Sequence, residues 1–307
     1  MMTSGPILVA SHDAGGAEVL SAYIKKNQEK YDFVIFVSGP AEQIFRRKNI
    51  NFHVVSIDLN DIYLLCGKYR SVQYLLASTG WSQFEALFLS CARKLKIKTI
   101  AYLDHWVNYK ERFGYPNLDW HNNVPDEIWV GDQYALTIAR QNFPGYPIKL
   151  EPNCYFDEVH KAYKEIAISR NDQSILILAQ PISEVQKKFT NNVTICEFTI
   201  LSQLLNFFVC HAKDDQLILR LHPSENREKY VRIIENYRHK IKISTNNLLE
   251  DIASSKIVIG INTMALITAS ICEKKAINFL PFEQQENLLP MKNIHLVRSL
   301  AELEAII

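Results

Sequence analysis

The chain has 307 residues, which exceeds one typical hydrophobic core, so two domains are expected. Hydrophobic residues make up 48% of the chain and charged residues 22%, as in an ordinary globular protein. The net charge of only +1 excludes a general electrostatic attraction to nucleic acid or to an anionic membrane. Peripheral membrane association could still arise from a local patch.

The six cysteines are scattered, without a CxxC pair or metal-ligand spacing. Such cysteines are typical of free thiols in a reducing compartment. The opening MMTSGPILVASHDAGG has neither the basic start nor the long apolar run of a secretory signal. No apolar run reaches the roughly 18 residues of a membrane span. We therefore expect a cytoplasmic protein.

The first apolar strand, residues 6–11, leads into a glycine-rich turn and then a helical pattern. This order is typical of a nucleotide-binding α/β domain, although the turn is not GxGxxG. Gly15 and Gly16 either let the backbone approach a ligand or only let the helix pack on the strand. His12 and Asp13 stand at the strand end, where open parallel sheets bind ligands. We expect these two side chains to be catalytic.

Apolar strands and amphipathic helices then alternate every 20 to 30 residues, the pattern of a parallel sheet. The strands expected in this half are residues 6–11, 33–38, 52–56, 97–103 and 127–131, with a short one before residue 79.

A dense polar and aromatic run, beginning with Asp104, His105 and Trp106 and reaching Arg112, follows the strand 97–103. Aromatic faces stack on sugars, and charged groups bind hydroxyls or phosphate. We therefore expect Asp104, His105 and Trp106 to bind substrate. The alternative is a surface loop with incidental aromatic residues.

The polar stretch 161–172 predicts a domain boundary, dividing the chain into residues 1–160 and 161–307. After it the strand and helix pattern restarts. We predict an α/β protein with two Rossmann-like, doubly wound domains that face each other across a cleft. The later strands are expected at residues 174–179, 217–221, 241–244, 257–261, 276–280 and 295–297, with a long helix over 193–212 and a short one over 245–254.

Two strands of the second half end in polar residues. The strand 217–221 ends in His222-Pro223, and 257–261 ends in Asn262-Thr263, which are expected as N-cap and first residue of a helix. A helix N-terminus with a histidine nearby is a competent phosphate site. We expect this edge to bind a nucleotide.

The order strand-RLHP, NLLEDIASS and IVIGINTMALITASICEKKAINFLP resembles the C-terminal domain of GT-B glycosyltransferases of bacterial surface-glycan synthesis. Sialyl-, polysialyl-, Kdo- and CDP-glycerol-type transferases carry a similar His-Pro pair and late turn. The resemblance implies that His222 is a third catalytic residue and that it contacts the donor phosphate, with Pro223 beside it. It also implies that Asn262, Thr263 and the backbone N–H groups after them bind phosphate or ribose.

The same resemblance implies a metal-independent enzyme without a cofactor, acting in surface polysaccharide synthesis. It would transfer a sugar from a nucleotide-sugar donor, held by residues 161–307, to a glycan or lipid-linked acceptor, held by residues 1–160. Asp13 fits the general base, although the family's Asp/Glu-Asp-Gly form is absent, and His12 is its alternative. Glu85 and Glu184 are weaker candidates. The alternative functions are a UDP-GlcNAc 2-epimerase-like enzyme and a non-catalytic nucleotide-sugar-binding protein.

Overall fold

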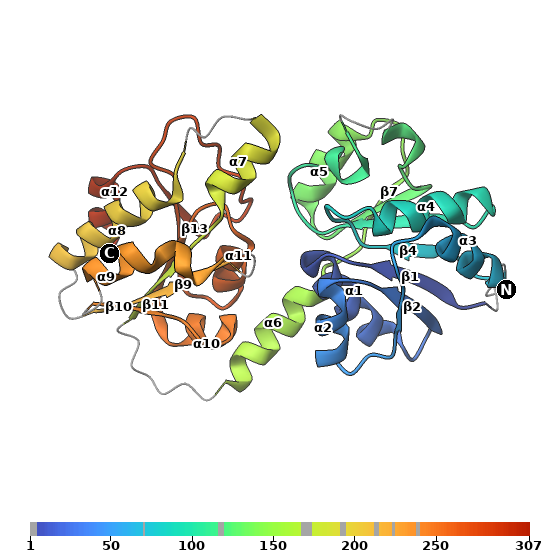
Figure 1. The fold of residues 1–307 in the computed structure, drawn as a ribbon, viewed down its shortest axis with the longest axis horizontal. Helices are drawn as coiled ribbons and strands as arrows, with labels where there is room; N and C mark the ends of the chain where they lie inside the picture. Colours follow the sequence, from blue (N-terminus) through green and yellow to red (C-terminus); the bar gives the residue numbers. More distant parts are fainter. Residues whose placement is uncertain are drawn as a thin grey trace. The chain divides into compact units, whose positions relative to one another are not determined.

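The computed structural model describes residues 5–69, 71–115, 120–166, 174–190, 195–211, 215–222, 225–237 and 240–307. The chain divides into two compact units, Met1–Glu158 and Val159–Ile307. Each unit is built around its own parallel sheet (Figure 1).

Unit 1 contains a seven-stranded parallel sheet in the order β3-β2-β1-β4-β5-β6-β7. In its centre Val9 pairs in register with Ile35 on one side and Leu76 on the other. Central strands such as β1 and β5 are buried along their whole length, because helices cover both faces of the sheet. The strands are β1 (Ile7–Ser11), β2 (Phe33–Val37), β3 (His53–Val54), β4 (Leu75–Ala77), β5 (Thr99–Leu103), β6 (Glu127–Val130) and β7 (Ile148–Leu150).

The helices of unit 1 lie on both faces of this sheet (Figure 1). The α1 and α2 helices share one apolar core with the sheet, while α4 packs on β1 and β4 and contacts α3. The helices are α1 (Ala14–Asn27), α2 (Pro40–Arg47), α3 (Leu59–Lys68), α4 (Phe84–Lys94) and α5 (Gln133–Asn142), with 3-10 turns η1 (Glu111–Phe113) and η2 (Trp120–Asn122). The α6 helix (Cys154–Glu165) begins in unit 1 and ends in unit 2.

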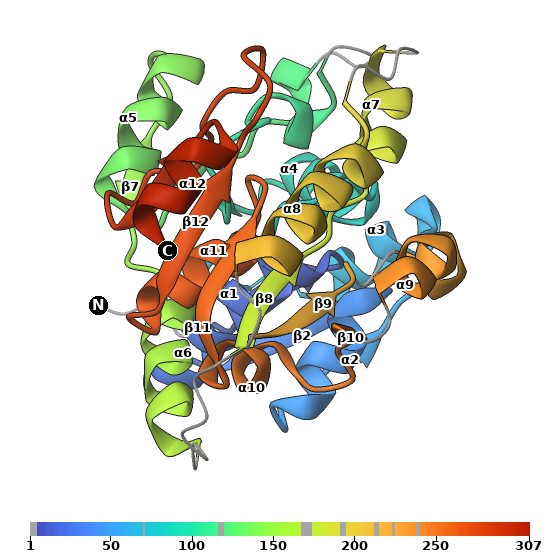
Figure 2. The ribbon, with the colours of Figure 1, turned by 90° about the vertical axis from the view of Figure 1, so that its left-hand side faces the viewer.

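Unit 2 repeats the plan with a six-stranded parallel sheet in the order β10-β9-β8-β11-β12-β13. One face carries the core shared with α8 and α12, which lie in front of the sheet in Figure 2, and α10 and α11 contact β11. The elements are β8 (Ser174–Leu178), α7 (Ile182–Thr190), α8 (Glu197–His211), β9 (Gln216–Arg220), η3 (Arg227–Tyr230), α9 (Val231–Tyr237), β10 (Ile241–Ile243), α10 (Leu248–Ala253), β11 (Ser255–Gly260), α11 (Met264–Ile271), β12 (Lys275–Phe279), β13 (Ile294–Val297) and α12 (Leu300–Ile306).

The prediction of two Rossmann-like, doubly wound domains is confirmed by these two sheets. Several helix bounds differ from expectation. The polar stretch that was expected to be the boundary is helical as far as Glu165, and the long helix expected from residue 193 begins at Glu197. The short helix expected from Thr245 begins at Leu248, because Asn247 forms a capping box with Glu250.

The strand order reverses at one place in each sheet, between β1 and β4 in unit 1 and between β8 and β11 in unit 2. In open α/β sheets, the loops that leave the carboxyl ends of the strands at such a switch point form the ligand site. His12 and Asp13 follow β1, and Asn262 and Thr263 follow β11. The fold therefore brings these four candidate residues to the switch points of their units.

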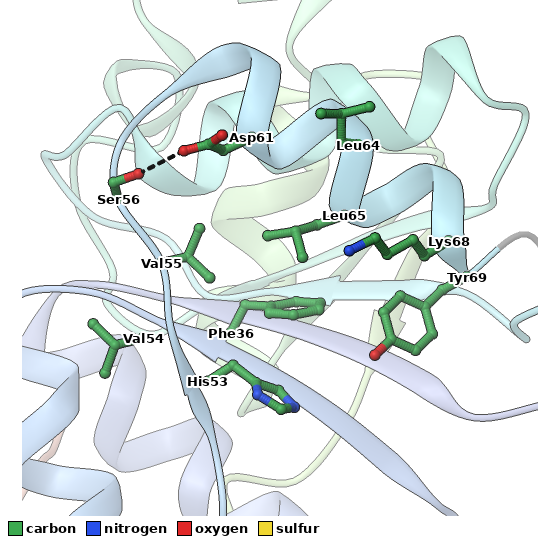
Figure 3. Close-up of a pocket in the computed structure, with 10 residues that line it drawn as sticks. All are labelled: Phe36, His53, Val54, Val55, Ser56, Asp61, Leu64, Leu65, Lys68 and Tyr69. Carbon is green, nitrogen blue, oxygen red and sulfur yellow. Dashed lines mark hydrogen bonds between the residues drawn. The ribbon is translucent and has the colours of Figure 1, made fainter.

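A cavity of about 510 Å³ lies elsewhere in unit 1, between α3 and strands β2 and β3 (Figure 3). Within the described ranges, no helix is long and apolar enough to cross a membrane. The same ranges contain no group of three or more His, Cys, Asp or Glu side chains that could hold a metal ion.

Candidate functional site

The two residues after β1 form a hydrogen-bonded dyad. His12 Nδ1 lies 2.7 Å from Asp13 Oδ1, and the Trp81 backbone N–H donates to Asp13 Oδ2 at 2.6 Å. A carboxylate only accepts hydrogen bonds, so it fixes the imidazole with its hydrogen on Nδ1. The basic lone pair of His12 is then on Nε2. Both side chains are partly exposed, at 19% for His12 and 25% for Asp13.

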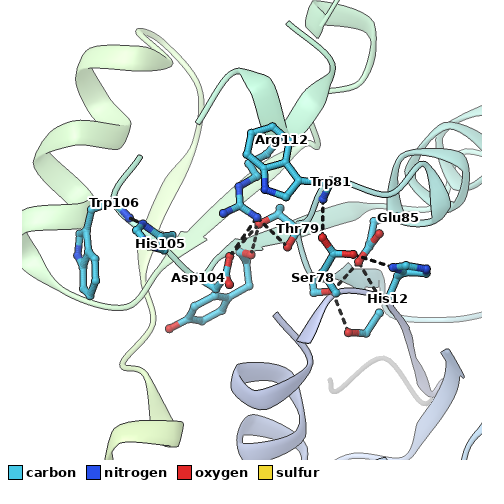
Figure 4. Close-up of polar contacts among 12 residues, drawn as sticks. His12, Ser78, Thr79, Trp81, Glu85, Asp104, His105, Trp106 and Arg112 are labelled. Carbon is cyan, nitrogen blue, oxygen red and sulfur yellow. Dashed lines mark hydrogen bonds and ion pairs between the residues drawn. The ribbon is translucent and has the colours of Figure 1, made fainter. Parts of the chain in front are cut away.

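Glu85, in the first turn of α4, links the residue after β1 to the loop after β4 and lies beside His12 (Figure 4). It is 3% exposed. Its Oε1 accepts from the His12 backbone N–H and from Ser78 Oγ, both at 2.9 Å, and its Oε2 accepts from Ser82 Oγ at 2.8 Å. Burial raises the pKa of Glu85, against the opposing effect of these hydrogen bonds.

The loop after β4 can approach the dyad only because residue 80 is glycine. A Cβ atom at Gly80 would lie 2.3 Å from the Asp13 carboxylate, which no real side chain could tolerate. The close approach also places the neighbouring Trp81 N–H on Asp13. The sequence offered a signal for this loop, since Gly80 follows a short strand, but it did not indicate that the loop would contact Asp13.

Gly15 and Gly16 lie in the first turn of α1. A Cβ at Gly15 would lie 2.4 Å from Asp104 Oδ2, and one at Gly16 would lie 2.5 Å from Ser78 Cβ. The protein's own side chains therefore fill the space beside both glycines. This geometry favours the packing explanation of the two glycines over a direct approach to ligand.

Asp104 lies at the carboxyl end of β5 and faces Arg112 (Figure 4). The Arg112 Nη1 atom is 3.8 Å from Asp104 Oδ1, and it donates to the Thr79 backbone carbonyl at 3.4 Å. Its guanidinium lies 5.2 Å from the centre of the Trp81 ring. Arg112 thus adds a positive charge beside the dyad, where an anionic or hydroxyl-rich ligand could bind.

His105 and Trp106 lie on the other side of Asp104 from the dyad (Figure 4). The Trp106 backbone N–H donates to His105 Nδ1 at 2.9 Å, and burial lowers the pKa of His105. The Trp106 ring is 5% exposed, and its Nε1 donates to the helix-capping Asp132 at 2.8 Å. The buried indole supports β5 and β6, and this geometry gives no support to sugar stacking on its face.

At the switch point of unit 2, residues after β8 and β11 are joined directly. Gln180 Nε2 donates to Thr263 Oγ1 at 2.9 Å, and Thr263 Oγ1 accepts from the Ala265 backbone N–H at 3.4 Å. Thr263 is therefore the N-cap of α11, where the sequence had predicted Asn262. The correction follows from the backbone: Asn262 has a φ of 44°, whereas the extended Thr263 has the conformation of a cap.

The Asn262 side chain makes three hydrogen bonds within the unit. Its Oδ1 accepts from Asn278 Nδ2 at 2.9 Å and from the Leu288 N–H at 3.1 Å, and its Nδ2 donates to the Glu286 carbonyl at 2.9 Å. These bonds hold the loop after β12 against the switch point. Any ligand contact by Asn262 stays a prediction, and the side chain has little capacity left for it.

His222 follows β9, and β9 and β11 are the two neighbours of β8. Two strand spacings, about 10 Å, therefore separate their axes. His222 is half-buried, and burial lowers its pKa against the opposing effect of Glu225, so the neutral imidazole is favoured at pH 7. Pro223 lies outside the described residues. The ligand roles of both residues stay predictions.

Sequence reasoning missed an ion cluster around Lys229 in unit 2. The Lys229 amino group lies 3.0 Å from Glu184, 2.6 Å from Glu197 and 2.9 Å from Glu225. Burial would lower the pKa of Lys229, but the carboxylates outweigh it and hold that pKa above its usual range. Glu225 and Lys229 are four residues apart, which was the one available signal. Glu184 is thus the exposed member of a structural ion cluster.

No family model matches the sequence, and no curated protein matches it. The fold, however, resembles solved structures over nearly the whole chain. The UDP-GlcNAc 2-epimerase from Methanocaldococcus jannaschii matches with a TM-score of 0.69 and 14% identity, over 98% of this chain and 92% of that chain.

Two further structures were solved with ligands. The Neisseria meningitidis 2-epimerase bound to UDP-GlcNAc matches with a TM-score of 0.67 and 11% identity, over 98% and 89% of the two chains. Anabaena HepE in complex with UDP and glucose matches with a TM-score of 0.63 and 12% identity, over 98% and 88%. At these identities the likeness establishes the fold, which is the predicted GT-B architecture.

Proposed function

We propose that this protein is a metal-independent glycosyltransferase that uses a nucleotide-sugar donor. The observation that carries the proposal is the His12–Asp13 dyad, which is held on buried Glu85 at the switch point of unit 1. Such a dyad can take a proton from an acceptor hydroxyl. The nucleotide ligands named for the structurally similar proteins support a nucleotide-sugar donor.

In the proposed reaction His12 is the general base and Asp13 orients it. The sequence had favoured Asp13 as the base, with His12 as the alternative. The acceptor hydroxyl gives its proton to His12 Nε2, and its oxygen bonds to the anomeric carbon of the donor sugar. The bond from that carbon to the nucleotide phosphate breaks, and the phosphate leaves with the electron pair. Asp13 stabilises the imidazolium that forms, because its carboxylate accepts the Nδ1–H.

The leaving phosphate is assigned in this proposal to the switch point of unit 2. Thr263, the N–H groups at the start of α11 and the His222-Pro223 pair would bind it. Among these groups, the α11 N–H groups and His222 act most strongly on the charge that develops as the nucleotide leaves, so losing one of those donors should cost on the order of 100-fold in turnover. A cleft that brings the two units' sites together is part of the proposal.

For the acceptor we propose a glycan or a lipid-linked sugar in surface polysaccharide synthesis, held by unit 1. Arg112 and Asp104 beside the dyad could bind its hydroxyl or phosphate groups. The support is the sequence resemblance to sialyl-, Kdo- and CDP-glycerol-type transferases together with the position of the dyad.

A UDP-GlcNAc 2-epimerase-like reaction is the second candidate. It is favoured by the alignment of 98% of this chain with two structures of such epimerases. In that case no acceptor is needed, and the dyad would act on a proton of the sugar itself. A protein that only binds nucleotide sugars is the third candidate.

The test is to incubate the protein with CMP-, UDP-, GDP- and CDP-linked sugars, with and without glycan and lipid-linked acceptors. Free nucleotide and sugar products would be followed by chromatography and NMR. Acceptor-dependent nucleotide release that is lost in His12→Ala and retained in the control His121→Ala supports the transferase. Interconversion of sugar epimers, or UDP release with a free 2-epimer, supports the second candidate. Tight binding without turnover supports the third.

A further inference from the structure

The cavity between α3 and strands β2 and β3 has no part in the proposed reaction. Its volume of about 510 Å³ falls in the usual range of small-molecule sites. It is lined by β2, β3, the loop after β3, α3 and the residue after α3, so none of the dyad, Glu85 or Arg112 contributes to it. Its lining includes Phe36, His53, Val54, Leu64, Leu65 and Lys68 (Figure 3).

The middle of the cavity is apolar. Phe36 is 1% exposed and forms its base, and Leu65 projects from α3 above that ring (Figure 3). At the rim, Val54 and Leu64 are left 58% and 64% exposed. Large aliphatic side chains grouped in this way around an opening mark a surface that binds something apolar.

One end of the cavity carries three side chains that can donate hydrogen bonds. Figure 3 shows the Lys68 amino group, the Tyr69 hydroxyl and the His53 ring gathered around Phe36. None of these three polar groups has a hydrogen bond or ion pair to another residue in the part of the chain that the structure describes. At the other end Ser56 Oγ donates to Asp61 Oδ2 at 3.0 Å, so that end is already satisfied.

We propose that this cavity binds a single-chain amphiphile with an anionic head group. The head, a phosphate monoester or a carboxylate, would lie against Lys68, Tyr69 and His53, since a lysine amino group and uncharged donors complement an anion. The alkyl chain would lie on Phe36 and Leu65 and leave between Val54 and Leu64. The charge at one end and the apolar middle of the cavity together determine this choice of ligand.

Decyl phosphate and decanoate, below their micelle concentrations, are the probes, and binding is measured by calorimetry. We expect one molecule per chain. Affinity should rise about fourfold for each methylene added from hexyl to decyl phosphate, the value for burying one methylene. Inorganic phosphate and decyltrimethylammonium should not bind, because each lacks one of the two recognised parts.

Two variants locate the ligand. Lys68→Glu, which places a negative charge beside the head group, should weaken decyl phosphate binding at least tenfold. Lys25→Glu, an exposed lysine on α1, makes the same change in net charge elsewhere and should leave binding unchanged. Leu65→Trp should fill the cavity and abolish binding, with circular dichroism showing that the protein is folded. If Leu65→Trp unfolds the chain, the comparison of Lys68→Glu with Lys25→Glu decides whether the ligand binds in this cavity.

The proposal is overturned if decyltrimethylammonium binds as well as decyl phosphate, or if the two lysine variants weaken binding equally. It is also overturned if the protein binds phosphatidylglycerol vesicles but neither monomeric probe, because the surface would then contact a membrane without a pocket. These measurements contain no nucleotide sugar. Their failure would leave the glycosyltransferase proposal untouched.

Discussion

The two switch points have the same topology but different chemistry. In unit 1, the residues after β1 and β4 bring titratable groups into contact, with His12 bonded to Asp13 and its backbone bonded to Glu85. In unit 2, the residues after β8 and β11 meet through neutral groups, the Gln180 amide and the Thr263 hydroxyl. Coupled titratable groups can exchange protons with a substrate, whereas neutral donors and a helix N-terminus can bind a phosphate without doing so.

If this contrast is correct, the largest effect should come from removing the proton acceptor. His12→Ala should lower turnover about 1,000-fold, within the range for loss of a general base, and leave donor affinity nearly unchanged. Initial rates of nucleotide release and a donor binding isotherm measure the two quantities. His121→Ala, on the exposed η2 turn, is the control for loss of an imidazole. A variant that keeps more than a tenth of the wild-type rate would rule out His12 as the base.

Asp13→Asn tests the dyad without changing its size and should lower turnover about 100-fold, the lower end of the range for general acid–base catalysis. The Trp81 N–H would keep the amide oxygen as its acceptor, so the amide NH₂ would face His12 Nδ1. The imidazole hydrogen would then move mainly to Nε2, so only the minor tautomer would keep the basic lone pair there. NMR of the histidine ring nitrogens should show the change of tautomer. The control is Asp157→Asn, since Asp157 is an exposed carboxylate on α6.

Much of the fold could be predicted because each buried strand is an unbroken apolar run followed by turn residues. The segments around β1, β5 and β11 are of this kind. The α3 helix was not predicted, although Asp58 caps it by accepting from the N–H groups of Asn60 and Asp61. Only two of its residues, Ile62 and Cys66, are fully buried, so its apolar spacing is weak. The cavity beside it was therefore missed as well.

The candidate site was predicted only in part. His12 and Asp13 could be predicted as site residues because they directly follow a strand, and the carboxyl ends of parallel strands share one edge of the sheet. The same rule indicated Trp106, yet it cannot tell a buried side chain from an exposed one, and Trp106 is buried against Asp132. The sequence indicated Glu85 only as a candidate, and it could not predict its partners. The Glu85 carboxylate bonds to the His12 backbone and to Ser78, which are 73 and 7 positions away in the chain.

Substitutions at the switch point of unit 2 should have a smaller effect, and the effect should be on donor affinity. Thr263→Val removes the hydroxyl that accepts from Gln180 and from the Ala265 N–H. We expect about tenfold weaker donor binding, and about 1 kcal/mol lower stability through loss of the helix cap. Thr263→Ser keeps the hydroxyl and should behave like the wild type. For comparison, Thr137→Val alters an exposed threonine on α5. Unchanged donor affinity in Thr263→Val would contradict the assignment of the phosphate to α11.

The smallest expected effect is on stability, and it tests how the titration of Glu85 changes the free energy of unfolding. Burial raises the pKa of Glu85 above its ordinary 4.5, so the folded protein keeps a proton that the unfolded chain has lost. The contribution of Glu85 to the free energy of unfolding is therefore greatest below pH 4.5 and declines as the pH rises through the folded-state value. Glu85→Gln removes this titration while its amide oxygen can still accept from the His12 N–H.

The difference in unfolding free energy, Glu85→Gln minus wild type, should therefore increase as the pH rises from 4.5. Urea denaturation at pH 4, 6 and 8 measures it, with Glu29→Gln, an exposed residue, as the reference for a plain loss of charge. A difference that stays constant or decreases over this range would mean that the three hydrogen bonds to the carboxylate outweigh its burial. The dyad of unit 1 would then rest on a fully charged Glu85, and the electrostatic contrast between the two switch points would be greater still.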